Sequence, residues 1–390
     1  MRFLAINHPR LGASPSGIPD HVVTDRSAFS TRAAWFRAVE TAIQQQVHAV
    51  FLTGEIIAKT NRSLEPFGPL VDGISQLQQA QIPVVVVAND AFTPAIAKRF
   101  GLLDAIEFVE DRLDWDPPIV TTTDAVNGRS VHIIAAQLAE SDDAPVPDPI
   151  SLNDIDHPDS IWLLTSARQP DSMEGDHALV IEAGSLSPLS ASETGDHGAW
   201  LVDTDTREAT LVPLANLEFA SVAIEISSAG NLEDVERIIA QELVGLAEGS
   251  AATTIVVDAT LTGATRLYPA LADTATDLQQ TLSIEHEGVL VVLSDISIDA
   301  TPTIDLDPLL GRPDPVGEVA RLIQALSTGD ELTEAQAQLV TAVDQKLLAV
   351  SHARVFGSII DTPAEADATV LLQRQAWAAL DTMVRQRGID

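Results

Sequence analysis

The sequence predicts an α/β fold: a two-sheet sandwich flanked by helices, followed by a small α+β unit and C-terminal helices. Three observations predict it. Apolar strands alternate with helix-period stretches over residues 1–90, short strands bounded by turn residues follow, and helical periodicity alone remains towards the end. A chain of 390 residues suits one large domain with one or two small ones. We therefore divide it into a large domain 1–215, a small domain 216–300, a linker 301–315 and a helical segment 316–390.

The large domain opens with predicted strands at 2–6, 48–53 and 82–87, separated by helix-period stretches at 31–46 and 66–79. Each strand is a short apolar run, and each helical stretch repeats its apolar residues every three or four positions. A β-α-β-α-β order builds a parallel sheet, whose functional groups lie just past the carboxyl ends of its strands. These strand ends are therefore the first place where a site is expected.

Further short elements complete the large domain. A short helix at 94–100 and a strand at 105–108 precede a loop-rich region with apolar runs at 119–121 and 131–135. The second set of strands is at 161–164, 178–181, 199–203 and 209–213. The polar residues 204–207 join the last two strands as a hairpin. This order predicts a second sheet packed against the first, with helices on the outside.

Residues 216–300 repeat a smaller α+β pattern of ordinary small-domain size. The predicted strands are at 221–226, 253–258 and 288–296, and the helices are at 232–247 and 267–277. Asn231 stands before the first of these helices and suits its N-cap.

The last part of the chain is predicted to be helical. A short helix at 316–326 precedes a helix that Thr333 and Gln336 open as a capping box. The final helix, 362–387, carries the apolar residues Leu371, Leu372, Trp377 and Leu380. Two interpretations of these side chains remain open. They pack against their own chain, or they form an arm that docks a helix or coiled coil of a partner protein.

The composition excludes several kinds of site. The chain has no Cys, which excludes disulfides, thiolate nucleophiles and Cys-ligated metal sites. It has no apolar run long enough to span a membrane, and its start is predicted to be a strand, not a signal peptide. A cytoplasmic location is therefore expected. Aromatic residues make up only 4% of the chain, too few for a platform that stacks single-stranded nucleic acid.

The net charge of −35 is spread along the whole chain. An even spread indicates a solvated acidic coat instead of an interaction tail, and we interpret it as an adaptation to high salt. At ordinary salt such a coat opposes direct DNA binding, which relies on Lys and Arg. At about 1 M salt the Debye length is only about 3 Å, so the charge alone does not exclude a nucleic-acid partner.

Polar residues follow the ends of the first three strands: Asn7-His8-Pro9-Arg10, Gly54-Glu55 and Asn89-Asp90. Imidazole, carboxylate and amide groups are ligands of divalent cations, so these ends predict a possible metal site. No His lies in a His-x-His or His-Glu-x-x-His motif. His177 and His197 each follow an Asp later in the chain, which we interpret as chance proximity of common residues.

The order of the motifs resembles one known family. The segments that carry the resemblance are Met1-Arg2-Phe3-Leu4, Leu11-Gly12, 49–55, 81–90, 181–189 and 193–203. They follow one another at the spacing found in the SbcD/YhaO branch of the calcineurin-like metallophosphoesterases. Residues 216–300 resemble the capping domain of that family, and the terminal helices resemble its ATPase-docking segment. The resemblance implies a calcineurin-like two-sheet fold and a nuclease subunit that pairs with an SbcC-like ATPase in DNA double-strand-break repair.

The chain departs from the family pattern where the metals bind. In the family, a two-metal centre takes its ligands from Asp-x-His, Asp, Asn-His and Gly-His-x-His segments, and it holds two cations about 4 Å apart. Here the corresponding positions hold His8, Arg10, Glu55, Asn89, Asp90, Ser166 and Arg168. Arginine stays charged under ordinary conditions, so it replaces the charge of a metal and does not bind one.

Two interpretations of these positions remain open. In the first, Glu55 and Asp90 pair with Arg10 and Arg168 as a salt-bridged plug that needs no cofactor. The protein is then a catalytically degenerate scaffold or regulator that reaches DNA through the ATPase complex, or a stand-alone structural dimer. In the second, His8, Glu55, Asn89 and Asp90 hold Mn²⁺ in an active exonuclease or phosphodiesterase with a rewired site.

Overall fold

A computed structural model describes the following residues: 1–20, 25–58, 64–86, 94–102, 104–108, 119–123, 130–134, 160–164, 170–174, 178–328, 332–351 and 368–388. They belong to two compact units. The first is Met1–Ser221, Leu243–Asp258 and Ser283–Ser294, and the second is Val222–Glu242, Ala259–Leu282 and Asp295–Asp390. This division does not test the predicted domain limits at residues 215, 300 and 315, which stay predictions.

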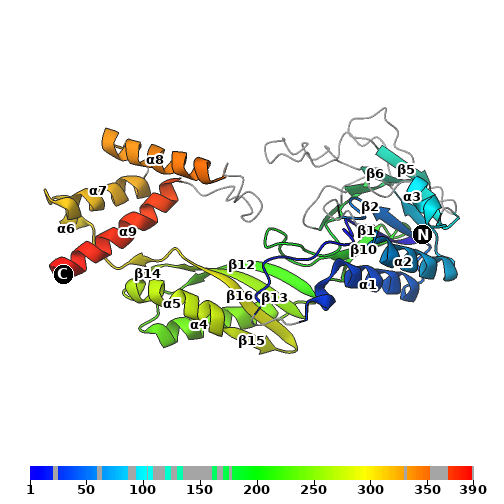
Figure 1. Cartoon of the computed structure of the whole chain (residues 1–390), viewed down its shortest axis with the longest axis horizontal. Coiled ribbons are helices and arrows are strands. Elements are labelled where there is room, and N and C mark those ends of the chain that lie inside the picture. The colour runs from blue at the N-terminus through cyan, green and yellow to red at the C-terminus, as the bar shows by residue number, and fades with distance from the viewer. Residues whose placement is uncertain are drawn as a thin grey trace. The chain divides into compact units, whose positions relative to one another are not determined.

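The first sheet has six strands in the order β11-β10-β1-β2-β3-β4. Figure 1 labels β1, β2 and β10 of this sheet. The strands are β1 (Arg2–Asn7), β2 (Ala49–Thr53), β3 (Val84–Val86), β4 (Ile106–Phe108), β10 (Gly198–Asp203) and β11 (Glu208–Pro213). Strands β1 to β4 are parallel, and β10 and β11 form an antiparallel hairpin in which Asp203 pairs with Glu208. The predicted parallel start and the hairpin are therefore confirmed.

Helices cover one face of this sheet. They are α1 (Thr31–Gln44), α2 (Phe67–Gln79) and α3 (Pro94–Arg99), with a short 3-10 turn η1 (Ser27–Phe29) before α1. Leu4 and Ile6 pack in one core cluster with helix residues such as Trp35 and Ile74. Phe3 and Ala5 belong to a different cluster, because successive strand residues point to opposite faces.

The second sheet has the order β5-β6-β7-β9-β8. Its strands are β5 (Ile119–Thr123), β6 (Ser130–Ile134), β7 (Ser160–Leu164), β8 (Asp171–Glu174) and β9 (Ala178–Glu182). Ile161 and Ile181 of this sheet share a buried cluster with Phe3, Phe51 and Trp200 of the first sheet. The two sheets thus stack face to face, and the predicted α/β two-sheet sandwich with flanking helices is confirmed.

The next part of the chain forms a four-stranded sheet in the order β12-β13-β16-β15. The strands are β12 (Leu217–Glu225), β13 (Thr254–Thr262), β15 (Ser283–His286) and β16 (Val289–Ile298), and the accompanying helices are α4 (Leu232–Ala247) and α5 (Tyr268–Thr281). The side chain of Asn231 accepts a hydrogen bond from Asp234 N at 2.9 Å, so the predicted cap of α4 is confirmed. A small two-stranded sheet pairs β14 (Ala264–Thr265) with β17 (Thr301–Pro302).

The C-terminal helices are α6 (Asp307–Leu310), α7 (Pro315–Thr328), α8 (Glu334–Ser351) and α9 (Ala368–Arg387). The capping box at α8 is confirmed, because Thr333 N donates to Gln336 Oε1 at 2.9 Å and Gln336 N donates to Thr333 Oγ1 at 3.4 Å. Helix α6 lies inside the segment 301–315 that was predicted as a linker, and the limits of that linker stay a prediction. The predicted start of the last helix, at 362–367, lies outside the described residues. Among the described helices, none is long and apolar enough to cross a membrane.

Candidate functional site

The ends of β1 and β2 lie side by side. Asn7 pairs with Thr53 in the parallel register, and the pairing continues past both strands, because His8 N donates to Thr53 O at 3.0 Å and Arg10 N donates to Glu55 O at 2.9 Å. The structure therefore brings together His8, Arg10 and Glu55 of the predicted site. The other predicted positions, Asn89, Asp90, Ser166 and Arg168, lie outside the described residues.

The backbone at these strand ends adopts conformations that most residues avoid. His8 and Arg10 both have φ of 43°, and Gly54 has φ of 68°. A Cβ at Gly54 would lie 2.5 Å from Asn7 Oδ1 and 2.7 Å from His8 Nδ1, so only glycine fits there. A non-glycine residue at positive φ costs of order 1–3 kcal/mol and persists only where its surroundings hold it.

Asn7 holds the end of β1 in place. Its side chain is buried, its Oδ1 accepts a hydrogen bond from Thr53 Oγ1 at 3.0 Å, and its Nδ2 donates to Gly184 O. Leu186 N donates to the backbone oxygen of Asn7 at 3.0 Å. These contacts attach residues 184–197, the connection between β9 and β10, to the end of β1. We call this connection the 184–197 loop.

Arg10 forms a largely buried ion pair with Glu193 of the 184–197 loop. Nη1 of Arg10 donates to Oε1 of Glu193 at 2.7 Å, and Nη2 donates to Oε2 at 2.6 Å. Nη2 also donates to Ser187 O at 2.7 Å. The Arg10 and Glu193 side chains are only 14% and 12% exposed. Two parallel charge-assisted hydrogen bonds of this kind are among the strongest polar contacts in proteins.

Of the predicted plug, in which Glu55 and Asp90 pair with Arg10 and Arg168, the described residues include only Glu55 and Arg10, so the plug as a whole stays a prediction. Glu55 contacts Arg10 through its backbone oxygen, whereas the guanidinium contacts Glu193. The left-handed conformation at Arg10 changes the direction in which its side chain leaves the backbone. The guanidinium then lies against the 184–197 loop, where Ser187 O and the Glu193 carboxylate accept its hydrogen bonds.

A chain of hydrogen bonds continues from Glu193 to His197. Ser185 Oγ lies 3.0 Å from Glu193 Oε2 and 2.9 Å from His197 Nδ1, and Nδ1 is 3.1 Å from Ser185 O. A carbonyl oxygen only accepts, so His197 Nδ1 carries the proton and the Ser185 hydroxyl donates to Glu193. His197 is 1% exposed, and its Nε2 makes no hydrogen bond with the described residues.

Burial and neighbouring charges set the protonation of these groups. Burial raises the pKa of Glu193, but hydrogen bonding and charge from Arg10, together with Ser185 and His197, outweigh it, so the pKa lies below its usual value. Burial is also the largest influence on His197 and lowers its pKa. The Ser185 backbone and Glu193 oppose that change, and Arg10 adds to it. At neutral pH the site therefore holds a guanidinium, a carboxylate and a neutral imidazole.

The geometry of His8 bears on metal binding. Glu55 N donates a hydrogen bond to His8 Nδ1 at 2.8 Å. Because Nδ1 uses its lone pair as an acceptor, the proton of the neutral ring is on Nε2. Neither nitrogen then offers a lone pair to a metal ion. Tight metal binding by His8 would require this hydrogen bond to break.

The described donor groups do not fit a two-metal centre. Arg10 offers positive charge and no lone pair, and its carboxylate partner Glu193 is already held by both guanidinium nitrogens. Within the described ranges, which leave out 87–93 and 165–169, no group of three His, Asp or Glu side chains could hold a metal ion. Ser185 is buried and donates to a carboxylate, so it is also not placed as a nucleophile.

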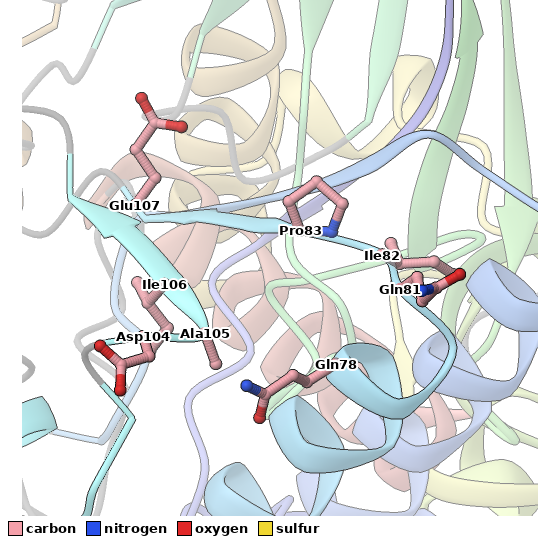
Figure 2. Close-up of a pocket in the computed structure, with 8 residues that line it drawn as sticks. All are labelled: Gln78, Gln81, Ile82, Pro83, Asp104, Ala105, Ile106 and Glu107. Atoms are coloured by element: carbon pink, nitrogen blue, oxygen red, sulfur yellow. The ribbon is translucent and has the colours of Figure 1, made fainter.

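A shallow pocket of about 350 Å³ lies at the opposite end of the first sheet (Figure 2). It is lined by Gln78 and Gln81 near the end of α2, by Ile82 and Pro83 before β3, and by residues 104–107 at β4. The Asp104 and Glu107 carboxylates point in different directions in Figure 2. Sites in parallel sheets lie at the carboxyl ends of the strands, whereas this pocket lies at the amino ends of β3 and β4. We assign no function to it.

The four residues predicted to bind a partner lie on α9 and differ in exposure. Leu380 is fully buried in a cluster with Leu309, Val316 and Ile323 of the same unit, and Trp377 packs against that cluster. For these two residues, packing against their own chain accounts for the apolar side chain. Leu371 and Leu372 are partly exposed. Their role in binding a partner stays a prediction.

Sequence reasoning missed three residues of this network: Ser185, Glu193 and His197. All lie in the segments 181–189 and 193–203 that carried the resemblance, but His197 was interpreted as chance proximity and Glu193 received no role. One signal was present. An unpaired Arg at a strand end requires a carboxylate near it, and Glu193 is the acid that follows the turn at Gly184-Ser185.

No protein-family model and no curated protein sequence matches the chain. Among solved structures, it is similar to TT1561 of Thermus thermophilus, with 14% identity and a TM-score of 0.30 over 55% of this chain and 98% of the other. It is also similar to a dimetal phosphatase from Danio rerio, with 12% identity and a TM-score of 0.29 over 52% of this chain and 91% of the other. Each likeness spans about half of this chain. The sheet order and the buried layer between the two sheets, described above, establish that the chain is an α/β protein with two stacked mixed sheets.

Proposed function

We propose that this protein is a catalytically degenerate relative of the SbcD-type nuclease subunits. It would act as a scaffold or regulator of an SbcC-like ATPase in DNA double-strand-break repair. The observation that supports the proposal is the largely buried Arg10–Glu193 pair at the end of β1. A bound cation at this place would meet a guanidinium, and two positive charges at close range repel each other strongly in a partly buried site. The charge that a metal supplies in the related nucleases is supplied here by the chain itself.

The competing hypothesis is an active exonuclease or phosphodiesterase that binds Mn²⁺ through His8, Glu55, Asn89 and Asp90. The hydrogen bond from Glu55 N to His8 Nδ1 disfavours it, because it occupies the imidazole lone pair that a metal would use. Asn89 and Asp90 lie outside the described residues. The two hypotheses therefore differ in one measurable property, the stoichiometric binding of a metal ion.

Metal content and hydrolysis test the proposal directly. We expect full-length protein purified in high salt to contain far less than one equivalent of Mn²⁺ or Zn²⁺ per chain by elemental analysis. We also expect no Mn²⁺-dependent hydrolysis of bis(p-nitrophenyl) phosphate or linear DNA, and no difference between wild type and Glu55→Ala. Stoichiometric Mn²⁺ together with hydrolysis that is lost in Glu55→Ala would establish the competing hypothesis.

The acidic coat leads to a separate proposal, that the protein is adapted to high salt. Its net charge of −35 favours expansion of the chain through mutual repulsion. Raising KCl from about 0.1 M to about 1 M shortens the Debye length from about 10 Å to about 3 Å. We therefore expect the urea midpoint of unfolding to rise along this KCl series, and to rise less in a series of sucrose solutions at low salt. A midpoint that stays flat or falls with KCl would contradict the adaptation.

A further inference from the structure

His197 lies directly before β10, and its hydrogen bonds to Ser185 are made by Nδ1. Its Nδ1–H faces Ser185 O and Ser185 Oγ, and the Ser185 hydroxyl donates onward to Glu193. The Nε2 atom is buried and makes no hydrogen bond with the described residues. The imidazole thus completes the network as a neutral ring with one unused lone pair.

The charges around His197 are balanced without it. Arg10 contributes one positive charge and Glu193 one negative charge, and both act on the pKa of His197. Glu193 already accepts hydrogen bonds from both terminal nitrogens of Arg10 and from Ser185. Glu218 on β12 has a raised pKa, because it is partly buried and lies near the negative charge of Asp196. Burial is therefore the main obstacle to an imidazolium at His197, and it outweighs the favourable charge of Glu193.

We propose that His197 is an acid-sensitive latch, whose protonation at Nε2 releases the 184–197 loop from the strand ends. The Nε2 atom is buried and makes no hydrogen bond with the described residues, so the added N–H would be buried away from water, and such a group is costly until it reaches water. Loop opening supplies that water. The proposal stands on the contacts of His197 and is independent of the partner or activity proposed above.

Both ends of the 184–197 loop are hydrogen-bonded to other parts of the first unit, so release of the loop would affect those parts. At one end, Asn7 binds Gly184 and Leu186. At the other end, Gly195 N donates to Phe219 O at 3.1 Å, and Phe219 belongs to β12. Phe219 also packs with Ile18 and Phe29, which belong to the connection between β1 and α1. Protonation of one buried ring would therefore loosen both the strand-end site and the start of β12.

The direction of the pH effect follows from linkage. In the unfolded or open state His197 titrates near the ordinary histidine pKa of 6.5, whereas in the closed state the pKa is lower. Above the ordinary pKa the closed state is unaffected. As the pH falls below it, the open state takes up a proton that the closed state does not hold, so the closed state loses stability until the pH passes the lowered pKa.

Hydrogen exchange followed by mass spectrometry tests the latch in the full-length protein. Between about pH 7.5 and about pH 5.5, after correction for intrinsic exchange, we expect protection of residues 184–197 and of the start of β12 to fall, by up to about tenfold per pH unit. The variant His197→Asn keeps a side-chain N–H near the position of Nδ1 and cannot be protonated. Its protection should change little over the same range. The matched control His286→Asn alters a partly exposed histidine on β15 and should respond like wild type.

Two results would overturn the latch. One is equal pH dependence of the protection in wild type and His197→Asn. The other comes from wild type alone, so it does not require that the variant folds: an NMR titration in which His197 becomes protonated at or above the ordinary histidine pKa, with the 184–197 loop still protected.

Discussion

Removal of the Arg10 guanidinium alone is expected to destabilise the first unit by about 3–5 kcal/mol. The variant Arg10→Met leaves the Glu193 carboxylate without its counter-charge in a largely buried place. The variant Glu193→Gln likewise leaves the Arg10 guanidinium without a counter-charge. The double variant Arg10→Met/Glu193→Gln buries no unpaired charge, so it should recover most of the loss. Urea unfolding of wild type, the two single variants and the double variant measures the coupling free energy of the pair.

The exposed pair Arg26–Asp20 is the matched control for this cycle, because its side chains are 40% and 94% exposed. Arg26→Met should change the free energy of unfolding by less than about 1 kcal/mol. If the effects of Arg10→Met and Glu193→Gln simply add, the two groups do not depend on each other. The proposal that an internal ion pair takes the place of bound metal would then lose its main support. A large coupling free energy would instead explain how the ends of β1 and β2 keep their conformation although an arginine stands there.

The second large effect is expected at Leu380. Replacing this fully buried side chain by Ala removes its packing against Leu309, Val316 and Ile323 and leaves a cavity. Such changes cost about 3 kcal/mol, with a range of about 2–5. Circular dichroism during thermal unfolding should show an earlier transition of the second unit. If the protein binds an ATPase as proposed, loss of that binding in Leu380→Ala would therefore report unfolding and would not identify a docking contact.

Variants at exposed residues of the C-terminal helices can separate the loss of partner docking from unfolding of the second unit. Leu339 on α8 is 49% exposed and Val370 on α9 is 41% exposed, so Leu339→Asp and Val370→Asp should change the free energy of unfolding by only about 0.5 kcal/mol. If α8 and α9 dock an ATPase, these variants should weaken co-purification of the co-expressed pair while the thermal transition stays in place. Unchanged co-purification in both would count against a docking surface on these helices.

Most of the regular elements could be predicted because local pattern and burial agree. In β1, Phe3 and Ala5 face one core cluster and Leu4 and Ile6 face another, so both faces are apolar and the strand appears as a continuous apolar run. The strands β8 and β15 were missed because their sequences, Asp-Ser-Met-Glu and Ser-Ile-Glu-His, lack that pattern. Each is a short edge strand whose conformation comes from pairing with a neighbour, β9 or β16. Helix α6 was missed because four residues are too few for a helical period.

The candidate site was only partly predictable for a different reason. Residues His8, Arg10 and Glu55 follow strands that the sequence identifies, and parallel pairing brings such ends together. The partner of Arg10 lies 183 positions later in the chain, beyond any local pattern. In a chain with 57 acidic residues, the composition alone cannot single out Glu193.

The sequence by itself determined the α/β class, the order of most elements and the presence of His8 and Arg10 at the end of β1. These depend on apolar periodicity and on residue chemistry, which are local. Only the tertiary structure decided that Arg10 contacts Glu193, that His8 accepts from Glu55 N, and that the buried His197 makes no hydrogen bond to the described residues through Nε2. The physical reason is that a side chain's partner depends on the backbone direction at both residues. At Arg10 that direction is set by a left-handed φ that only the surrounding fold maintains.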